Sequence, residues 1–263
     1  MEWGFLSLVK GGGLCYTPPV PAACARVHAE AGPTPAEGVH RVVLASTSPR
    51  RRELLEQVGL GFEIVPPDAE AEAGLRAGRN LTETRLAVET AARAKAASVA
   101  ARMPPGTLVV AADTVVLLGR KMLGKPRDPD QAARMLRCLS GRLHRVLTAV
   151  AVHRAGDEGG LSACEETRIR FRHLREEEIA AYVSSGEPLD KAGAYGIQGL
   201  GALLVERVEG CYFNVVGLPL TALHRLLRAS GVDLLAGPDG VPRPGRAGSQ
   251  KPSPDVEGGR CAW

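Results

Sequence analysis

The stretch that most constrains the fold spans residues 41–55, where an apolar run of strand length passes through small hydroxyl residues into a helix. Ser48 is a favoured N-cap residue and Pro49 suits the first helical position. We therefore expect a strand over about 41–46 followed by a helix over 49–58. Strand, short turn and helix in this order are typical of α/β proteins.

Three consecutive arginines, Arg50, Arg51 and Arg52, stand in the first turn of this expected helix. A helix N-terminus has free N–H groups and a partial positive charge, so it disfavours cations and binds anions. Arginines at such a position indicate a phosphate site. For Arg50 and Arg51 we favour this interpretation over solvated side chains. Arg52 should instead lie at the surface and pair with Glu56, four residues further on.

The rest of the chain predicts one α/β domain. Residues 1–40 and 236–263 are rich in Gly, Pro and Ala without sustained periodicity, so we interpret them as a disordered or weakly ordered extension and a disordered tail. Between them, over 41–235, helical crossovers and hairpin-like pairs predict a mixed, twisted sheet flanked by helices. Further strands are expected over about 62–65, 108–112 with a continuation over 114–118, 143–154, 164–172 and 202–208, and further helices over about 81–102, 128–140, 175–185 and 219–230.

Charge and composition limit the partners. The net charge of +4 suits a small anionic ligand better than a nucleic acid duplex, which usually requires a strong basic stripe. No apolar run approaches the ~20 residues of a membrane span, so no membrane partner is expected. The six cysteines are scattered without a CxxC pair, which favours reduced thiols and a cytoplasmic location.

Asp113 is the first candidate for chemistry, because it follows the apolar run 109–112. Carboxyl ends of strands are where α/β proteins place ligand groups. A carboxylate there could hold a divalent ion or act as a general base, and a turn-forming Asp is equally compatible with the position. Lys125, in a Gly-Lys-Pro turn, and Lys95, in the middle of an alanine-rich helix, are weaker candidates when taken alone.

A glycine-rich segment, Gly193–Gly199, lacks the Gly-Lys-Ser/Thr ending of a Walker A loop. Its Gln198 amide both donates and accepts, which suits the edge of a nucleobase, although a structural turn is the alternative. Asp190 and Lys191 could simply pair at the surface. Asn214 is most simply explained as a turn residue before a helix.

Seven motifs in this order resemble the Maf family of nucleoside triphosphate pyrophosphatases. They are Ala45–Arg51, Ala111–Val115, Gly124–Pro126, Leu139–Arg142, Asp190–Gly193, Tyr195–Gly199 and Asn214–Pro219. The resemblance covers about 41–235. It implies a Maf/inosine-triphosphatase-like architecture with a cleft for the nucleotide, hydrolysis between the α and β phosphates, a divalent metal (Mg or Mn) and a homodimer.

The same resemblance implies roles for individual residues. Asp113 matches the proton-accepting catalytic aspartate, and Lys95 and Lys125 match two active-site lysines. Substrate-binding positions fall on Ser46, Arg50, Arg51, Thr114 and Gln198. Arg50, Thr114 and Gln198 match the positions that set base specificity in the branch acting on dTTP and UTP. Gln198 favours that branch over the one acting on 7-methyl-GTP.

One loop departs from the family pattern. Members usually carry an Asp-Glu pair after the second strand, but here the expected glutamate falls on Ala71. Glu70 or Glu72 could take its place, and we assign Glu70 together with Asp113 as expected metal ligands. The altered loop leaves an alternative open, namely a catalytically weakened nucleotide-binding module that uses the same pocket.

Overall fold

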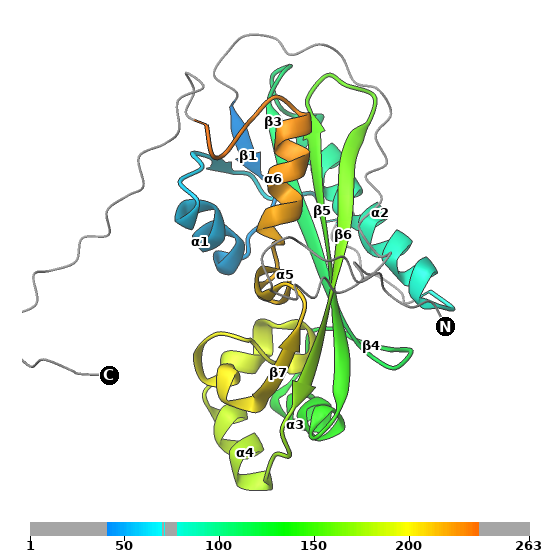
Figure 1. The fold of residues 1–263 in the computed structure, drawn as a ribbon, viewed down its shortest axis with the longest axis vertical. Coiled ribbons are helices and arrows are strands. Elements are labelled where there is room, and N and C mark those ends of the chain that lie inside the picture. The colour runs from blue at the N-terminus through cyan, green and yellow to red at the C-terminus, as the bar shows by residue number, and fades with distance from the viewer. Residues whose placement is uncertain (1–40, 70, 72–77, 237–263) are drawn as a thin grey trace, which may run out of the picture.

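A mixed seven-stranded sheet forms the centre of the molecule (Figure 1). The structure is a computed structural model and describes residues 41–69, 71 and 78–236. Strand β1 (Val42–Leu44) runs parallel to β2 (Glu63–Ile64) and to β3 (Leu108–Leu118). The predicted mixed sheet is confirmed. The predicted extension 1–40 and nearly all of the tail lie outside the described residues.

The remaining strands are antiparallel and give the order β2-β1-β3-β5-β6-β7, with β4 paired to the far end of β3. Their bounds are β4 Lys121–Leu123, β5 Leu143–Arg154, β6 Gly160–Phe171 and β7 Val205–Glu209. The sequence pattern placed the start of β6 four residues too late. It also missed β4, because three residues after a glycine turn are too few to show an alternation.

Six α-helices within the described residues flank the sheet: α1 Pro49–Gln57, α2 Leu81–Ala100, α3 Pro129–Leu139, α4 Glu176–Ser184, α5 Tyr212–Val216 and α6 Leu220–Ala229. Three short 3-10 helices lie in and around the glycine-rich segment 193–199: η1 (Glu187–Asp190), η2 (Ala192–Ala194) and η3 (Gly199–Leu204). The short α5 was not predicted. None of the helices in the described residues has the length and hydrophobicity needed to cross a membrane.

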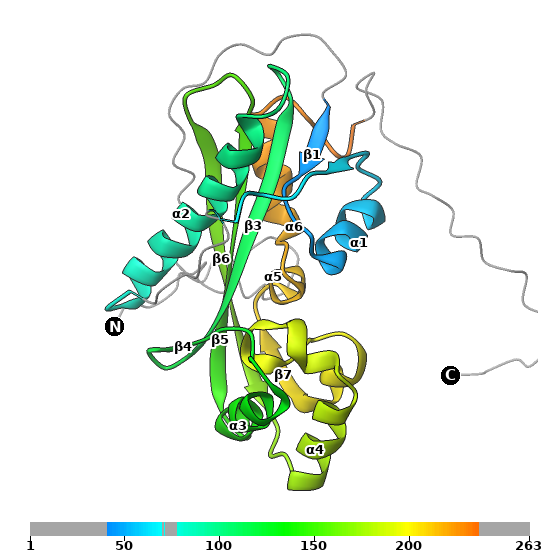
Figure 2. The ribbon, with the colours of Figure 1, turned by 180° about the vertical axis from the view of Figure 1, so that it is seen from behind.

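The two faces of the sheet are buried by different helices. Figure 2 shows α2 along one face, whereas α1 and α6 lie on the other. Successive residues of a strand point to opposite faces, so Val109 and Ala111 pack with α2 while Leu108 and Val110 belong to the core shared with α1 and α6. The small side chains of α2 facing the sheet, Ala92 and Ala96 among them, let the helix approach closely.

Helix ends follow the sequence in part. Asn80 caps α2, since its side chain accepts from the Glu83 N–H at 2.8 Å, and Asp128 caps α3 in the same way. Ser48 occupies the N-cap position of α1 but makes no side-chain capping bond. Its backbone N–H instead donates to Ser46 Oγ at 3.2 Å, so the hydroxyl that orders this turn is that of Ser46.

Two expectations about single residues are wrong. Asp113 does not end a strand, because β3 continues unbroken to Leu118 and pairs Asp113 with Ala149 of β5. Asn214 is not a turn residue before a helix, because it lies within α5 and is fully buried. Its Nδ2 donates to Val146 O at 3.0 Å and to Thr167 Oγ1 at 2.9 Å, so it ties α5 to the sheet.

Strand β3 is longer than its parallel neighbour β1, and this leaves a gap in the sheet beside 111–115, which we call the window. On the edge away from β5, β1 pairs with β3 over 108–110 and β4 pairs with it over 116–118. Among the described residues, no strand pairs with 111–115 on that edge. Asp113 and Thr114 therefore stand at a gap in the sheet, with their side chains on opposite faces of the strand.

A buried aromatic cluster forms around His144 of β5, next to the last β5 residue that pairs with β3. His144 Nε2 and the Tyr195 hydroxyl are 2.7 Å apart, and both rings contact Phe171 edge-on, with centroids 5.0 Å and 4.7 Å from its ring. His144 is 1% exposed, and burial lowers its pKa to about 4. The imidazole is therefore neutral at physiological pH.

The depressed pKa of His144 predicts a loss of stability in mild acid. The unfolded chain binds a proton near pH 6.5, whereas the folded chain binds it only near pH 4. The stabilisation is therefore complete above pH 6.5 and is lost as the pH falls toward 4, by up to about 1.4 kcal/mol per pH unit. Urea unfolding between pH 6.5 and 5 should show this slope in the wild type and a reduced slope in His144→Gln. Equal slopes in the wild type and the variant would contradict a lowered pKa of His144.

Candidate active site

A cavity of about 630 Å³ opens at the window in the sheet. That volume lies within the range of small-molecule sites. Its walls come from the β1–α1 turn, α2, β3, the loop after β4, the η1–η3 region and the end of α5. The structure brings together eight of the nine site residues predicted from the sequence: Ser46, Arg50, Arg51, Lys95, Asp113, Thr114, Lys125 and Gln198. The ninth, Glu70, lies outside the described residues.

Lys95 and Asp113 form an ion pair at one side of the cavity. Lys95 Nζ donates to Asp113 Oδ1 at 2.8 Å, and the two side chains are only 13% and 19% exposed. Lys95 therefore points from α2 into a polar cleft and does not snorkel to the surface. Because the lysine binds Oδ1, it fixes the carboxylate and leaves Oδ2 able to accept a proton.

Arg51 is held by three chain segments at once. Its Nε donates to Gly217 O at 2.9 Å, Nη1 to Ser46 Oγ at 3.1 Å and Nη2 to Thr114 Oγ1 at 3.2 Å. Gly217 ends α5 with a φ of 119°, a conformation that favours glycine. Bonds to three segments orient the guanidinium before any anion arrives.

The hydroxyl bonds behind Arg51 have a defined direction. Thr148 Oγ1 donates to Asn214 O at 2.8 Å, so its proton is not available to Thr114, which lies 3.0 Å away. Thr114 must therefore donate to Thr148 and accept from Arg51. A single relay of hydrogen bonds then runs from Arg51 through two strands to the buried backbone of Asn214.

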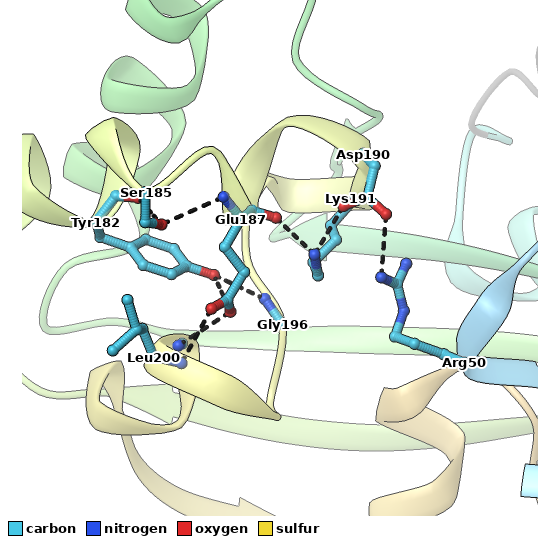
Figure 3. Close-up of polar contacts among 9 residues, drawn as sticks. Arg50, Tyr182, Ser185, Glu187, Asp190, Lys191, Gly196 and Leu200 are labelled. Carbon is cyan, nitrogen blue, oxygen red and sulfur yellow. Dashed lines mark hydrogen bonds and ion pairs between the residues drawn. The ribbon is translucent and has the colours of Figure 1, made fainter. Parts of the chain in front are cut away.

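Arg50 contacts the opposite wall of the cavity. Its Nη1 pairs with Asp190 Oδ2 at 3.2 Å, and Asp190 Oδ1 accepts from Lys191 at 2.7 Å (Figure 3). Burial alone would raise the pKa of Asp190, but the two cations hold it below its ordinary value. Asp190 and Lys191 do pair, as the sequence suggested. The sequence did not show that both line the cavity and that the Lys191 side chain is only 14% exposed.

The other two predicted residues are more exposed. Lys125 follows β4 and Gln198 precedes η3, and both lie at the cavity wall. Within the described part of the chain, neither side chain makes a hydrogen bond or ion pair. Both are therefore available to a ligand. Arg52 lies outside the cavity and pairs with Glu56 at 3.6 Å, as expected.

The described residues fit a cation that arrives with a phosphate chain better than a metal held by protein alone. No group of three or more His, Cys, Asp or Glu side chains among them could hold a metal ion. Mg²⁺ usually takes one or two carboxylates and completes its shell with water and substrate phosphates. Asp113 can supply one such carboxylate.

The sequence also matches the family model described as "Maf-like protein" over residues 41–230. This span is more than half of the chain and contains every cavity residue named above. The chain belongs to the Maf family.

Three relatives of this Maf domain are each named dTTP/UTP pyrophosphatase. The protein of Moorella thermoacetica is 53% identical over 196 residues, which cover 74% of this chain and 97% of its own. That of Anaeromyxobacter dehalogenans is 52% identical over 196 residues, covering 74% and 96%. That of Carboxydothermus hydrogenoformans is 49% identical over 191 residues, covering 73% and 99%.

Among solved structures, a nucleoside-triphosphatase/dITP/XTP pyrophosphatase from Mycobacterium abscessus aligns over 73% of this chain and 93% of its own. The identity is 15% and the TM-score is 0.34, a likeness too low to support an argument.

The three bonds of Arg51 predict that it stabilises the fold, unlike the arginine beside it. Arg51→Lys cannot reproduce the fork of donors, so we expect a loss of about 1–2 kcal/mol in the free energy of unfolding. Arg52→Lys, the matched control at an exposed position, should change it by less than about 0.5 kcal/mol. Urea unfolding measures the free energy of unfolding of both variants. Equal losses would contradict a stabilising role for the three bonds of Arg51.

Proposed function

We propose that the chain hydrolyses dTTP and UTP to the monophosphate and pyrophosphate. The observation that carries this proposal is the Lys95–Asp113 pair, because a fixed carboxylate shares one cavity with Arg50, Arg51 and Lys125. A base beside several phosphate-binding cations suits attack by water on a phosphate chain. The names of the relatives support the choice of pyrimidine nucleotides.

Asp113 is the proposed general base. Its Oδ2 accepts a proton from a water molecule whose oxygen attacks the α-phosphorus, while Lys95 holds Oδ1 and keeps the carboxylate in place. A bond forms between the water oxygen and the α-phosphorus, and the bond to the bridging oxygen of the β-phosphate breaks. The products are the nucleoside monophosphate and pyrophosphate.

The cations of the cavity bind the leaving group. Pyrophosphate gains negative charge as the bond breaks, so donors already aimed at it lower the barrier. Arg51 is pre-oriented by its three bonds, and Ser46 can donate its hydroxyl from the same turn. Arg50 and Lys125 also line the cavity and can contact the phosphates.

Gln198 is the proposed reader of the base. Its amide can donate and accept at once, which matches a uracil or thymine edge, and a wrong base leaves the amide unpaired. Thr114 donates its proton to Thr148 and accepts from Arg51. We therefore propose that Thr114 contributes to binding through this arginine.

No described residue favours the alternative of a weakened nucleotide-binding module. Asp113, Lys95 and Lys125 are present and share the cavity. In the altered acidic loop, Ala71 is described and contacts a groove along α2 and not the cavity. Glu70 and Glu72 lie outside the described residues.

The chemistry predicts one product pair and one essential carboxylate. Incubation with dTTP and Mg²⁺ or Mn²⁺ should release dTMP and pyrophosphate, as resolved by ion-exchange chromatography. Asp113→Asn should lower kcat by about 100-fold or more. Asp130→Asn, at an exposed position of α3, is the matched control. Release of orthophosphate alone, or full activity of Asp113→Asn, would refute the mechanism.

A divalent cation, Mg²⁺ or Mn²⁺, is part of the proposal. Asp113 would hold it together with phosphate oxygens, and when bound it neutralises charge on the phosphate chain. EDTA should therefore abolish turnover, and either cation should restore it. Because the described residues provide few metal ligands, calorimetry without nucleotide should detect only weak Mg²⁺ binding. Submicromolar Mg²⁺ binding by the free protein would contradict a substrate-borne cation.

The homodimer and the cytoplasmic location stay predictions. The first rests on the family resemblance alone. The second rests on the six scattered cysteines of the sequence, which include no CxxC pair.

A further inference from the structure

The proposed base reader, Gln198, lies on a segment that runs into η3 and is bound by side chains from outside it. Residues 196–201 carry Gln198, whose side chain is exposed and makes no hydrogen bond within the described chain. The amide therefore depends on the backbone of its loop for its place in the cavity. The contacts that hold this backbone therefore also set the position of the Gln198 amide relative to a bound base.

Two side chains outside the predicted site bind both ends of the loop (Figure 3). The Tyr182 hydroxyl accepts from Gly196 N at 3.1 Å and donates to Glu187 Oε1 at 2.9 Å. Glu187 Oε2 accepts from Leu200 N at 3.0 Å, and Oε1 accepts from Gly201 N at 3.1 Å. Burial raises the pKa of Tyr182 far above its usual range, so its hydroxyl stays a donor. Three backbone N–H groups thus depend on this pair.

The glycines of the loop show how closely it fits the pair. A Cβ on Gly201 would lie 2.1 Å from Gly196 O and 2.7 Å from the Tyr182 hydroxyl. A Cβ on Gly199, which has a φ of 62°, would lie 2.8 Å from Glu187 Oε2. The loop therefore closes directly on Tyr182 and Glu187, with no room for a side chain between them.

The pair is also connected to the phosphate side of the cavity. Lys191 Nζ donates to Glu187 O at 2.5 Å and to Asp190 Oδ1 at 2.7 Å, and Asp190 pairs with Arg50 (Figure 3). Contacts therefore run from the loop of Gln198 to the first turn of α1. The position of the base reader is set relative to a phosphate-binding arginine.

We propose that Tyr182 and Glu187 are positioning residues for base selectivity, which act by holding the 196–201 loop so that Gln198 meets the pyrimidine edge. This inference rests on the proposed function. Neither residue lines the cavity, so neither touches the nucleotide. Their effect is therefore confined to discrimination between bases, whereas a merely structural role would lower activity toward every nucleotide alike.

Tyr182→Phe and Glu187→Gln test the proposal with minimal change of shape. The first removes the acceptor for Gly196 N, and the second places an amide NH₂ against backbone N–H groups. We measure kcat/KM for UTP and for CTP, which differ at the edge that an amide reads. In each variant the UTP/CTP ratio should fall about tenfold, as expected when one buried hydrogen bond is lost. The kcat for UTP should stay within about threefold of the wild type.

Matched controls and a double variant separate positioning from folding. Tyr212→Phe and Glu177→Gln remove the same groups elsewhere and should leave the ratio unchanged. In a Gln198→Ala background, Tyr182→Phe should lower the ratio no further, because the two changes act on one contact. Thermal melting checks that each variant is folded.

The outcomes distinguish the two proposals. A wild type that does not hydrolyse UTP overturns the proposed function and this inference with it. If the wild type hydrolyses UTP, the inference alone is overturned by an unchanged ratio in both variants or by an equal loss toward both nucleotides. A wild type with no preference for UTP over CTP overturns the inference together with the base-reading role of Gln198, and leaves the pyrophosphatase activity standing.

Discussion

The site depends on one constraint, the unequal length of β3 and its parallel neighbour β1. β1 ends at Leu44 while β3 runs on to Leu118, and β4 pairs only with the far end of β3. The unpaired edge of β3 lies between β1 and β4, at the point where the chain turns from β1 into α1. A ligand at this window can reach side chains on both faces of β3, Asp113 toward α2 and Thr114 toward α5. In an ordinary site at the carboxyl ends of parallel strands, a ligand contacts only residues at the ends of those strands.

Arg51 joins the parts that meet at this window. It connects the β1–α1 turn, β3 and the end of α5, and the hydroxyl relay behind it continues to the backbone of Asn214. The relay explains why the buried Thr148 is polar. An apolar residue of similar size would fill the space, but it would leave Thr114, the acceptor of Arg51, without a fixed orientation. The core beneath the cavity is thus specialised for holding one arginine.

The sequence predicted the fold class and most elements, because apolar periodicity is a local signal. The set of residues that meet in the cavity was implied by the resemblance to the Maf family. The sequence could not predict contacts that form between distant segments. Asp113 was expected at a strand end because it directly follows an apolar run. Within β3 its carboxylate is paired with Lys95, which comes from another element. Asn214 and the Tyr182–Glu187 pair were missed for the same reason. Nothing local distinguishes a buried asparagine or a loop-binding glutamate from ordinary surface residues.

The charge of the cavity explains why the chain breaks the usual rule for helix starts. Among the described lining residues, Arg50, Arg51, Lys95, Lys125 and Lys191 face only two carboxylates, Asp113 and Asp190. Each carboxylate is engaged by cations, so the lining residues carry a surplus of positive charge. Cations at the start of α1 destabilise the free helix terminus by a few tenths of a kcal/mol each. A bound triphosphate would neutralise the surplus positive charge and would also interact favourably with the N-terminus of α1. The arginines therefore cause both the instability of the free helix start and its affinity for a polyanion.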